Sequence, residues 1–214
     1  MNNKILISLI FLLGLIIFGC NAEQNKKIEK DPLSSWYDGA AKQSIINFVN
    51  EVTDKANSNY VPANERIATF DNDGTLWSEQ PYYFQFQFAL DRVKEMAADH
   101  PEWNDEPLFK AVMDDDIEKV LSFGEHGLLE IVMATHAGMT TTEFGQIVKN
   151  WIGIAKHPKT NKLYKKMVFQ PMLELLDYLR ANGFNTYIVS GGGTEFMRPW
   201  VEEVYGIPPE QVIG

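Results

Sequence analysis

The chain has 214 residues, of which 45% are hydrophobic, and its 19 Lys and Arg against 29 Asp and Glu give a formal net charge of −10. This length suits one α/β domain with an insertion, or two small domains. The acidic balance leaves no basic patch to neutralise a nucleic-acid backbone or an anionic surface, so it disfavours such partners, although it does not exclude a phosphate bound locally.

The first twenty residues predict a targeting segment. Lys4 supplies a positive charge, and residues 5–18 form an apolar run that is too short for an ordinary transmembrane helix and suits a secretory signal. The run leads to Gly19 and Cys20, the only cysteine in the chain. This arrangement resembles a bacterial lipoprotein signal, in which cleavage leaves a lipid-bearing cysteine at the new N-terminus.

We therefore expect residues 1–20 to be a lipoprotein signal peptide, with lipid attached to Cys20. The protein would be exported and held by this lipid at a bacterial membrane, in the periplasm or on the outer surface. An uncleaved membrane anchor or an incidental cysteine is the alternative interpretation.

Between the signal and the first strand, the pattern predicts a linker and a helix. Residues 21–35 are polar and rich in lysine, as in a solvated linker. Apolar residues at helical spacing predict a helix between residues 36 and 56. The short apolar run 67–70 predicts a strand buried on both faces of a parallel sheet, and Gly74 predicts a turn directly after it.

A long, mostly helical region follows. The segments that we expect to be helical are residues 82–98, 106–123 and 127–134. A capping-box pattern from Thr140 to Glu143 predicts a further helix that ends near Ile152. The acidic run 114–116 lacks the spaced acids and the central glycine of a calcium loop, so we interpret it as a solvated face of the second helix.

The last part of the sequence predicts two further strands. A helix over residues 172–181 ends at Asn182-Gly183, a typical C-terminal signal. The apolar run 186–189 then predicts a second buried strand, which ends at Ser190 and three glycines. A helix over 195–205 and the start of a third strand at 212–213 complete the pattern.

Two carboxylates, Asp71 and Asp73, come directly after the first predicted strand. Because strand residues alternate sides, both are expected to lie on the same side of the extended chain. We place them at the carboxyl end of a central strand, where open α/β sheets bind ligands. Crowding two acids is costly without a cation or a shared proton. The pattern therefore indicates a catalytic and metal-binding site.

The stretch DNDGTLW (residues 71–77), with a later strand that ends in Ser190, resembles the haloacid dehalogenase superfamily of phosphatases. The resemblance spans residues 66–214 and implies a Rossmann-like, three-layer α/β core around a parallel sheet. Residues 36–77 and 166–214 would form this core, and residues 78–165 a helical cap inserted after the first strand. FDNDGTLW with the nearby Glu79-Gln80-Pro81 resembles a bacterial branch of nonspecific or phosphoserine-type phosphatases.

The resemblance implies a role for each site residue. Asp71 would be the nucleophile that forms an aspartyl-phosphate, and Asp73 would be the general acid and base. Mg²⁺ would be bound by the Asp71 carboxylate and the Asp73 backbone carbonyl. Ser190 and the Gly191 amide would bind the phosphate. The implied substrate is a small phosphorylated metabolite.

The sequence departs from the family after Ser190. No lysine follows Gly191 to neutralise the phosphate, and the later acids lie in or near a predicted helix instead of at a strand end. We interpret the core as incomplete at its C-terminal end, as in a truncated chain, with an unpaired edge beside the first strand.

Alternative functions stay open on the sequence alone. The chain is either a Mg²⁺-dependent phosphomonoester hydrolase or a non-catalytic lipoprotein that binds a phosphorylated ligand, and phosphoryl transfer to a sugar would use the same two aspartates. A serine hydrolase is disfavoured, since Ile188 stands where the first glycine of G-x-S-x-G would be. A P-loop is absent from the sequence, because no Gly-Lys-Ser/Thr follows the glycines after Ser190.

Overall fold

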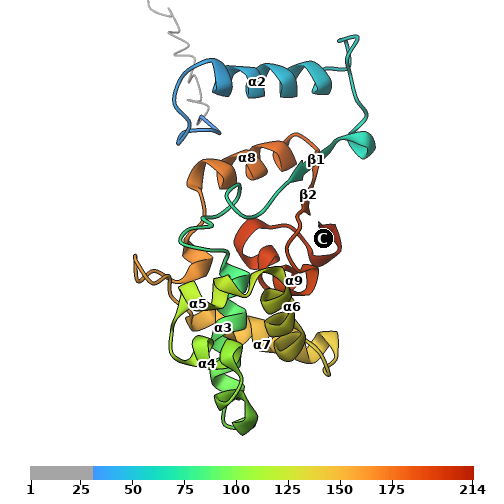
Figure 1. Cartoon of the computed structure of the whole chain (residues 1–214). Helices are drawn as coiled ribbons and strands as arrows, with labels where there is room; N and C mark the ends of the chain where they lie inside the picture. Colours follow the sequence, from blue (N-terminus) through green and yellow to red (C-terminus); the bar gives the residue numbers. More distant parts are fainter. Residues whose placement is uncertain (1–30) are drawn as a thin grey trace, which may run out of the picture. The chain divides into compact units, whose positions relative to one another are not determined.

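The computed structural model describes residues 31–214, and Pro32–Gly214 form an α/β unit (Figure 1). The α/β class predicted from the sequence is confirmed. The predicted signal peptide, the lipidation site Cys20 and most of the predicted linker lie outside the described residues. Within residues 31–214, no helix is long and apolar enough to cross a membrane.

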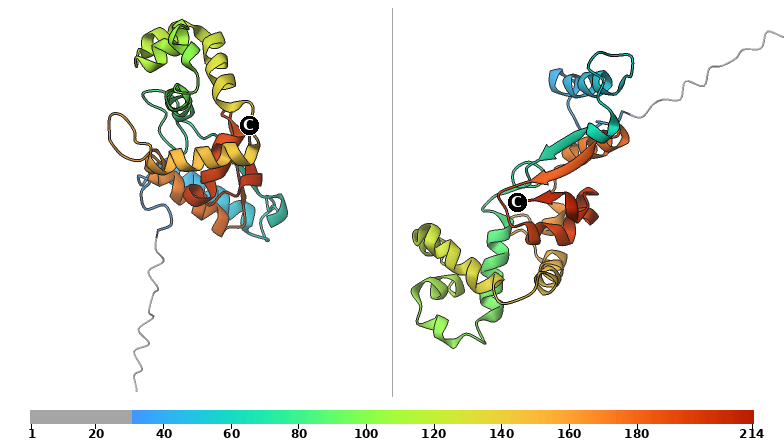
Figure 2. Two further views of the ribbon diagram at one scale, coloured as in Figure 1. Left: turned by 90° about the horizontal axis from the view of Figure 1, so that it is seen from below. Right: turned by 90° about the vertical axis from the view of Figure 1, so that its right-hand side faces the viewer.

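Three parallel strands form the sheet, in the spatial order β1-β2-β3. They are β1 (Ile67–Phe70), β2 (Asn185–Val189) and β3 (Val212–Ile213). Figure 2 shows β1 and β2 running side by side, with Phe70 aligned with Ile188. All three strands occur where the sequence predicts them. Among the described residues β2 is central and β1 is an edge strand. The expected central position of the first strand is therefore wrong for this part of the chain, whereas the expected unpaired edge beside it is present.

Only one face of this sheet is packed in the described part of the chain. Phe70 and Ile188 point to the packed face, and Ile188 is fully buried. On the opposite face, Ile67 is 59% exposed, Val189 46% and Ile213 52%. The expectation of strands buried on both faces is therefore wrong for residues 31–214, and these residues do not build a second helical layer over the sheet.

Three helices precede or follow strands outside the helical insertion: α2 (Ala40–Thr53), α8 (Gln170–Ala181) and α9 (Thr194–Tyr205). Val49 and Val52 of α2 pack with Leu179 of α8 and with Phe184 in a small apolar cluster. Helix α8 ends before Gly183, whose φ of 77° is a left-handed conformation that favours glycine. The predicted stop at Asn182-Gly183 is thus confirmed.

Five helices lie between β1 and α8, in the helical region that the sequence predicts. They are α3 (Phe84–Met96), α4 (Pro107–Met113), α5 (Ile117–Ser122), α6 (Gly124–His136) and α7 (Thr141–Ile154). Short 3₁₀ turns occur at Ala63–Glu65, Pro101–Asn104, Tyr164–Lys166 and Pro209–Gln211. Helices α3–α6 pack around an apolar cluster of their own and lie together in Figure 2, whereas α7 packs against α9.

The predicted single helix over residues 106–123 is wrong. It is two helices, α4 and α5, separated at the acidic run 114–116. Asp115 adopts a left-handed φ of 58°, and the Asp116 side chain accepts a hydrogen bond from the Lys119 amide at 3.0 Å, which caps α5. The run therefore ends one helix and starts the next instead of forming a solvated helix face.

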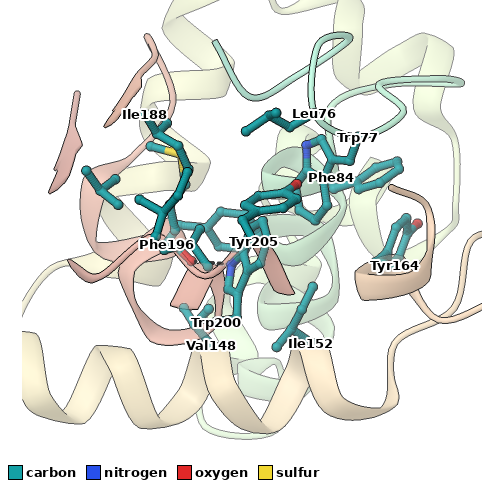
Figure 3. Packing of buried hydrophobic residues seen from close by; sticks show 14 of the residues in the cluster. Leu76, Trp77, Phe84, Val148, Ile152, Tyr164, Ile188, Phe196, Trp200 and Tyr205 are labelled. Atoms are coloured by element: carbon teal, nitrogen blue, oxygen red, sulfur yellow. Dashed lines mark hydrogen bonds between the residues drawn. The ribbon is translucent and has the colours of Figure 1, made fainter. Parts of the chain in front are cut away.

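An aromatic core joins α3, α7 and α9 to the loop after β1 (Figure 3). Trp77 is fully buried, stacks on Trp200 at 4.4 Å between ring centroids and meets Phe84 edge-on at 4.6 Å. Helix α7 adds Val148 and Ile152 to this core, and the predicted capping box at Thr140 and Glu143 is present. This core fixes the loop that carries the two aspartates.

Candidate active site

The loop after β1 is closed by hydrogen bonds to the backbone carbonyl of Asn72. The Asn72 carbonyl accepts hydrogen bonds from the amides of Thr75 at 3.2 Å, Leu76 at 2.9 Å and Trp77 at 3.3 Å. The chain can reverse so tightly because Gly74 takes a left-handed φ of 72°. As a result, Asp71 and Asp73 are held together at the carboxyl end of β1.

Asn72 itself is an anchor that the sequence pattern does not reveal. Its side chain is only 2% exposed, and its Oδ1 accepts a hydrogen bond from the Tyr205 hydroxyl at 3.2 Å. Burial raises the pKa of Tyr205 well above its usual value, so this hydroxyl stays protonated and can donate. The contact ties the aspartate loop to the end of α9.

The Asp73 carboxylate is partly buried and oriented by one hydrogen bond. Trp77 Nε1 donates to Asp73 Oδ1 at 2.7 Å. Burial raises the pKa of Asp73 above its usual range, and the Trp77 hydrogen bond partly opposes this because it favours the ionised form. The nearby charges of Asp71 and Glu79 raise the pKa of Asp73 further.

Asp71 differs from Asp73 in its surroundings. It is exposed, and one of its oxygens, Oδ1, accepts a hydrogen bond from the Asn72 amide at 2.7 Å. That bond orients the carboxylate, while Oδ2 has no hydrogen-bond partner among the described residues. Of the two acids, Asp71 is therefore the one open to a ligand.

The glycine segment after β2 forms the facing wall. The Ser190 amide donates to the Ile213 carbonyl at 3.0 Å, which continues the pairing with β3. The Ser190 hydroxyl oxygen accepts a hydrogen bond from the Gly192 amide at 3.3 Å. A methyl group placed on Gly192 would lie 3.7 Å from Ser190 Oγ and 3.9 Å from Asp73 Oδ2, so the two strand ends approach each other here.

All four predicted catalytic and phosphate-binding residues line one cavity of about 940 Å³. Besides Asp71, Asp73, Ser190 and Gly191, the lining includes residues of α3, α5 and α6. Such a volume falls in the upper part of the range that is usual for small-molecule sites, roughly 300–1,000 Å³. The parallel pairing of β1 and β2 thus brings together Asp71 and Gly191, which are 120 positions apart in the sequence.

Two further residues line this cavity to which the sequence pattern assigns no role in the site. Gln85, at the start of α3, accepts a hydrogen bond from the Gly193 amide through Oε1 at 2.7 Å and so connects the helical insertion to the glycine segment. Glu79 lies over the turn, with its carboxylate 3.1 Å from a methyl group placed on Gly74. Only the folded chain brings these side chains to the site.

The donor atoms at the site fit a magnesium ion. Mg²⁺ prefers oxygen ligands, keeps several waters and is often held by one or two carboxylates together with phosphate oxygens. The open Asp71 carboxylate and the neighbouring Asp73 backbone carbonyl supply such atoms, although no group of three or more His, Cys, Asp or Glu among residues 31–214 is arranged to hold a metal. These two residues would therefore need substrate oxygens and water to complete the coordination.

Positive charge is lacking among the side chains that line the cavity in the described part of the chain. None of the lining residues is Lys, Arg or His. Arg198, the one basic residue after Gly191, bonds to Glu195 at 2.5 Å and to the carbonyls of Pro209 and Val212. It therefore braces the segment that leads to β3.

Comparison with known families matches residues 68–214, most of the chain, to the haloacid dehalogenase-like hydrolases. The chain belongs to this family. The general chemistry of haloacid dehalogenase-like hydrolases is hydrolysis through phosphoryl transfer, and their general cofactor is Mg²⁺. A search of curated proteins gives no match to the chain.

Proposed function

We propose that this haloacid dehalogenase-like hydrolase is a Mg²⁺-dependent phosphomonoesterase that acts through an aspartyl-phosphate. The observation that carries this proposal is the convergence of Asp71, Asp73, Ser190 and Gly191 on one cavity. A second acid beside the nucleophile fits phosphate esters, whose leaving oxygen needs a proton. The substrate would be a small phosphorylated metabolite.

Each step is assigned to a residue of this chain. An Asp71 carboxylate oxygen attacks phosphorus, the bond from phosphorus to the ester oxygen breaks, and Asp73 donates a proton to the departing oxygen. Asp73, now ionised, accepts a proton from the water that attacks the aspartyl-phosphate. Phosphate then leaves and Asp71 is free again. The raised pKa of Asp73 brings this carboxyl closer to the working pH, as this shuttle requires.

The phosphate would be held by the glycine segment and by the metal. The Ser190 hydroxyl and the Gly191 amide are the donors offered to the phosphate oxygens. A magnesium ion bound by Asp71 and the Asp73 carbonyl would neutralise phosphoryl charge. Gln85 would keep the glycine segment in place through its bond to Gly193.

The test uses protein that lacks residues 1–20 and an aryl phosphate, with and without Mg²⁺. We expect metal-dependent hydrolysis, and a loss of at least about a thousandfold in Asp71→Asn, because the nucleophile is removed. Asp105→Asn, at an exposed carboxylate far from the cavity lining, is the matched control and should behave as the parent. If Asp71→Asn were as active as the parent protein, the proposal would be contradicted.

A second function is favoured by one observation, the lack of any Lys, Arg or His in the lining of the cavity. Without a basic side chain to offset phosphoryl charge, the protein would bind a phosphorylated ligand and not turn it over. This alternative predicts thermal stabilisation by inorganic phosphate with no hydrolysis of any ester. Measurable metal-dependent turnover would rule it out.

We also propose that the protein is exported and anchored to a bacterial membrane by lipid on Cys20. The apolar run before this cysteine supports the proposal. Cys20→Ser should move the protein from the membrane fraction to the soluble fraction; an unchanged membrane fraction contradicts lipid anchoring.

We further propose that the protein belongs to the nonspecific or phosphoserine-type branch of the family. The stretch FDNDGTLW with the nearby Glu79-Gln80-Pro81 supports this placement.

A further inference from the structure

Part of the cavity lining is apolar, and we call this part the wall. It is built by side chains from three helices of the insertion: Phe86, Ala89, Leu121, Leu128, Ile131 and Val132. Ala89 and Ile131 are buried in the cluster of α3–α6, so the wall is the outer surface of a packed core. The wall is therefore supported from behind by the packed side chains of this cluster.

Helix α6 presents one face to this cavity. Leu128, Ile131 and Val132 are spaced three and four residues apart, which places them on the same side of the helix. Leu129, on the same helix, is 60% exposed and does not line the cavity. Leu121 of α5 and Val132 line the cavity although both remain exposed to solvent. A ligand could therefore remove apolar surface from water here.

The charged side chains that line the cavity are all acidic: Asp71, Asp73 and Glu79. Among the described residues, Glu79 has no hydrogen bond or ion pair that would neutralise it. A substrate with a second anionic group would find no basic side chain in the lining to pair with. Such substrates are disfavoured, because a charge that leaves water without gaining an ion-pair partner loses its hydration and gains nothing in return.

We infer that the site takes phosphate monoesters of an uncharged, apolar alcohol or phenol, whose hydrocarbon part lies against the wall formed by α3, α5 and α6. The inference rests on the proposed function, since it assumes that the phosphate lies between Asp71 and Ser190. The hydrocarbon part then extends away from the acids toward Leu128 and Val132.

The experiment compares three non-hydrolysable ligands: ethylphosphonate, hexylphosphonate and a hexylphosphonate with a terminal carboxylate. Their binding to the protein lacking residues 1–20 is measured by calorimetry with Mg²⁺ present. We expect affinity to rise about three- to fourfold for each methylene that leaves water, and to fall at least about tenfold when the carboxylate is added.

Substitutions in the wall test whether this surface causes the expected order of ligand affinities. Leu128→Lys should weaken hexylphosphonate and favour the carboxylated ligand, which reverses their order. Leu129→Lys adds the same charge to the same helix outside the cavity and should leave the order unchanged. Leu128→Ala, which adds no charge, should reduce the gain per methylene, and it keeps the test valid if Leu128→Lys fails to fold.

The outcomes separate the inference from the proposed function. Equal affinity for ethylphosphonate and hexylphosphonate, tight binding of the carboxylated ligand, or no binding of any of the three would overturn the inferred substrate class. Turnover is measured separately, on ethyl phosphate and hexyl phosphate. Failure to hydrolyse either ester, with the binding order as expected, would contradict the phosphatase proposal and leave the ligand class standing.

Discussion

Asp73 is the residue whose surroundings bear most directly on the chemistry. Its carboxyl is partly buried, receives a hydrogen bond from Trp77 Nε1 and lies near the charges of Asp71 and Glu79. Burial and the two acids raise its pKa, whereas the hydrogen bond lowers it. The balance of these effects sets the pH range in which Asp73 can donate a proton.

Trp77→Phe should therefore move the alkaline limb of the pH dependence of kcat to higher pH. Removing the indole N–H withdraws a donor that favours ionised Asp73, so the acid stays protonated to higher pH. Trp200→Phe is the matched control, because Trp200 is equally buried but its Nε1 donates to the Phe196 carbonyl. A shift of the same size in both variants would contradict a specific role for the Trp77 hydrogen bond.

The same surroundings predict that Asp73→Asn stabilises the fold while it removes activity. A carboxyl with a raised pKa in the folded state binds its proton more tightly there, so folding loses stability as the pH rises from the ordinary aspartate range to the raised value. Asparagine can keep the hydrogen bond from Trp77 without the charge. Thermal unfolding at pH 7 should show a higher Tm for the variant.

The stabilisation should vanish at a pH below the ordinary aspartate range, where Asp73 is protonated in the folded and unfolded states. The same scan on Asp105→Asn controls for the general loss of a negative charge, because Asp105 is exposed. A lower Tm for Asp73→Asn at pH 7 would contradict the account of its burial.

At the scale of elements, the junction between α4 and α5 depends on one capping side chain. Asp116→Ala removes the hydrogen bond to the Lys119 amide and should lower the free energy of unfolding by about 1 kcal/mol. Asp114→Ala, which removes an exposed ion pair with Lys110 at 3.3 Å, should cost less than about 0.5 kcal/mol. Urea unfolding of the two variants measures the difference, and equal losses would show that the cap does not matter.

The one-sided packing of the sheet predicts a large contrast between neighbours on β2. Ile188→Ala empties a fully buried position and should cost about 2–5 kcal/mol. Val189→Ala, at a side chain that is 46% exposed on the opposite face, should cost about 1 kcal/mol or less. Urea unfolding midpoints that fall equally in both variants would mean that both faces of β2 are covered in solution.

At the scale of the whole molecule, the sequence predicts the strands and the helical insertion well, because apolar runs and helical spacing are local signals. It does not predict the exposed face of the sheet. Ile67 and Val189 are apolar strand residues, and the sequence around them does not tell whether a second layer of helices covers them. The helix break at Asp115 is also missed, because it depends on a left-handed backbone conformation of a non-glycine residue.

The candidate site divides in the same way. The resemblance to the family implies that Asp71, Asp73, Ser190 and Gly191 share one site, and they do line one cavity. Their meeting depends on the parallel pairing of β1 and β2. Their supporting contacts are long-range: Tyr205 bonds Asn72, and the Gly193 amide bonds Gln85. No local sequence pattern predicts such contacts. The catalytic roles of the four residues stay predictions.

The central claim, a phosphoryl group carried by Asp71, is tested most directly by trapping that intermediate. Borohydride reduces an acyl phosphate, so protein quenched during turnover and then reduced would carry homoserine in place of Asp71, detectable by peptide mass spectrometry. We predict this change only when both substrate and Mg²⁺ are present. Turnover of the ester without homoserine at position 71, or with homoserine at another aspartate, would contradict the account.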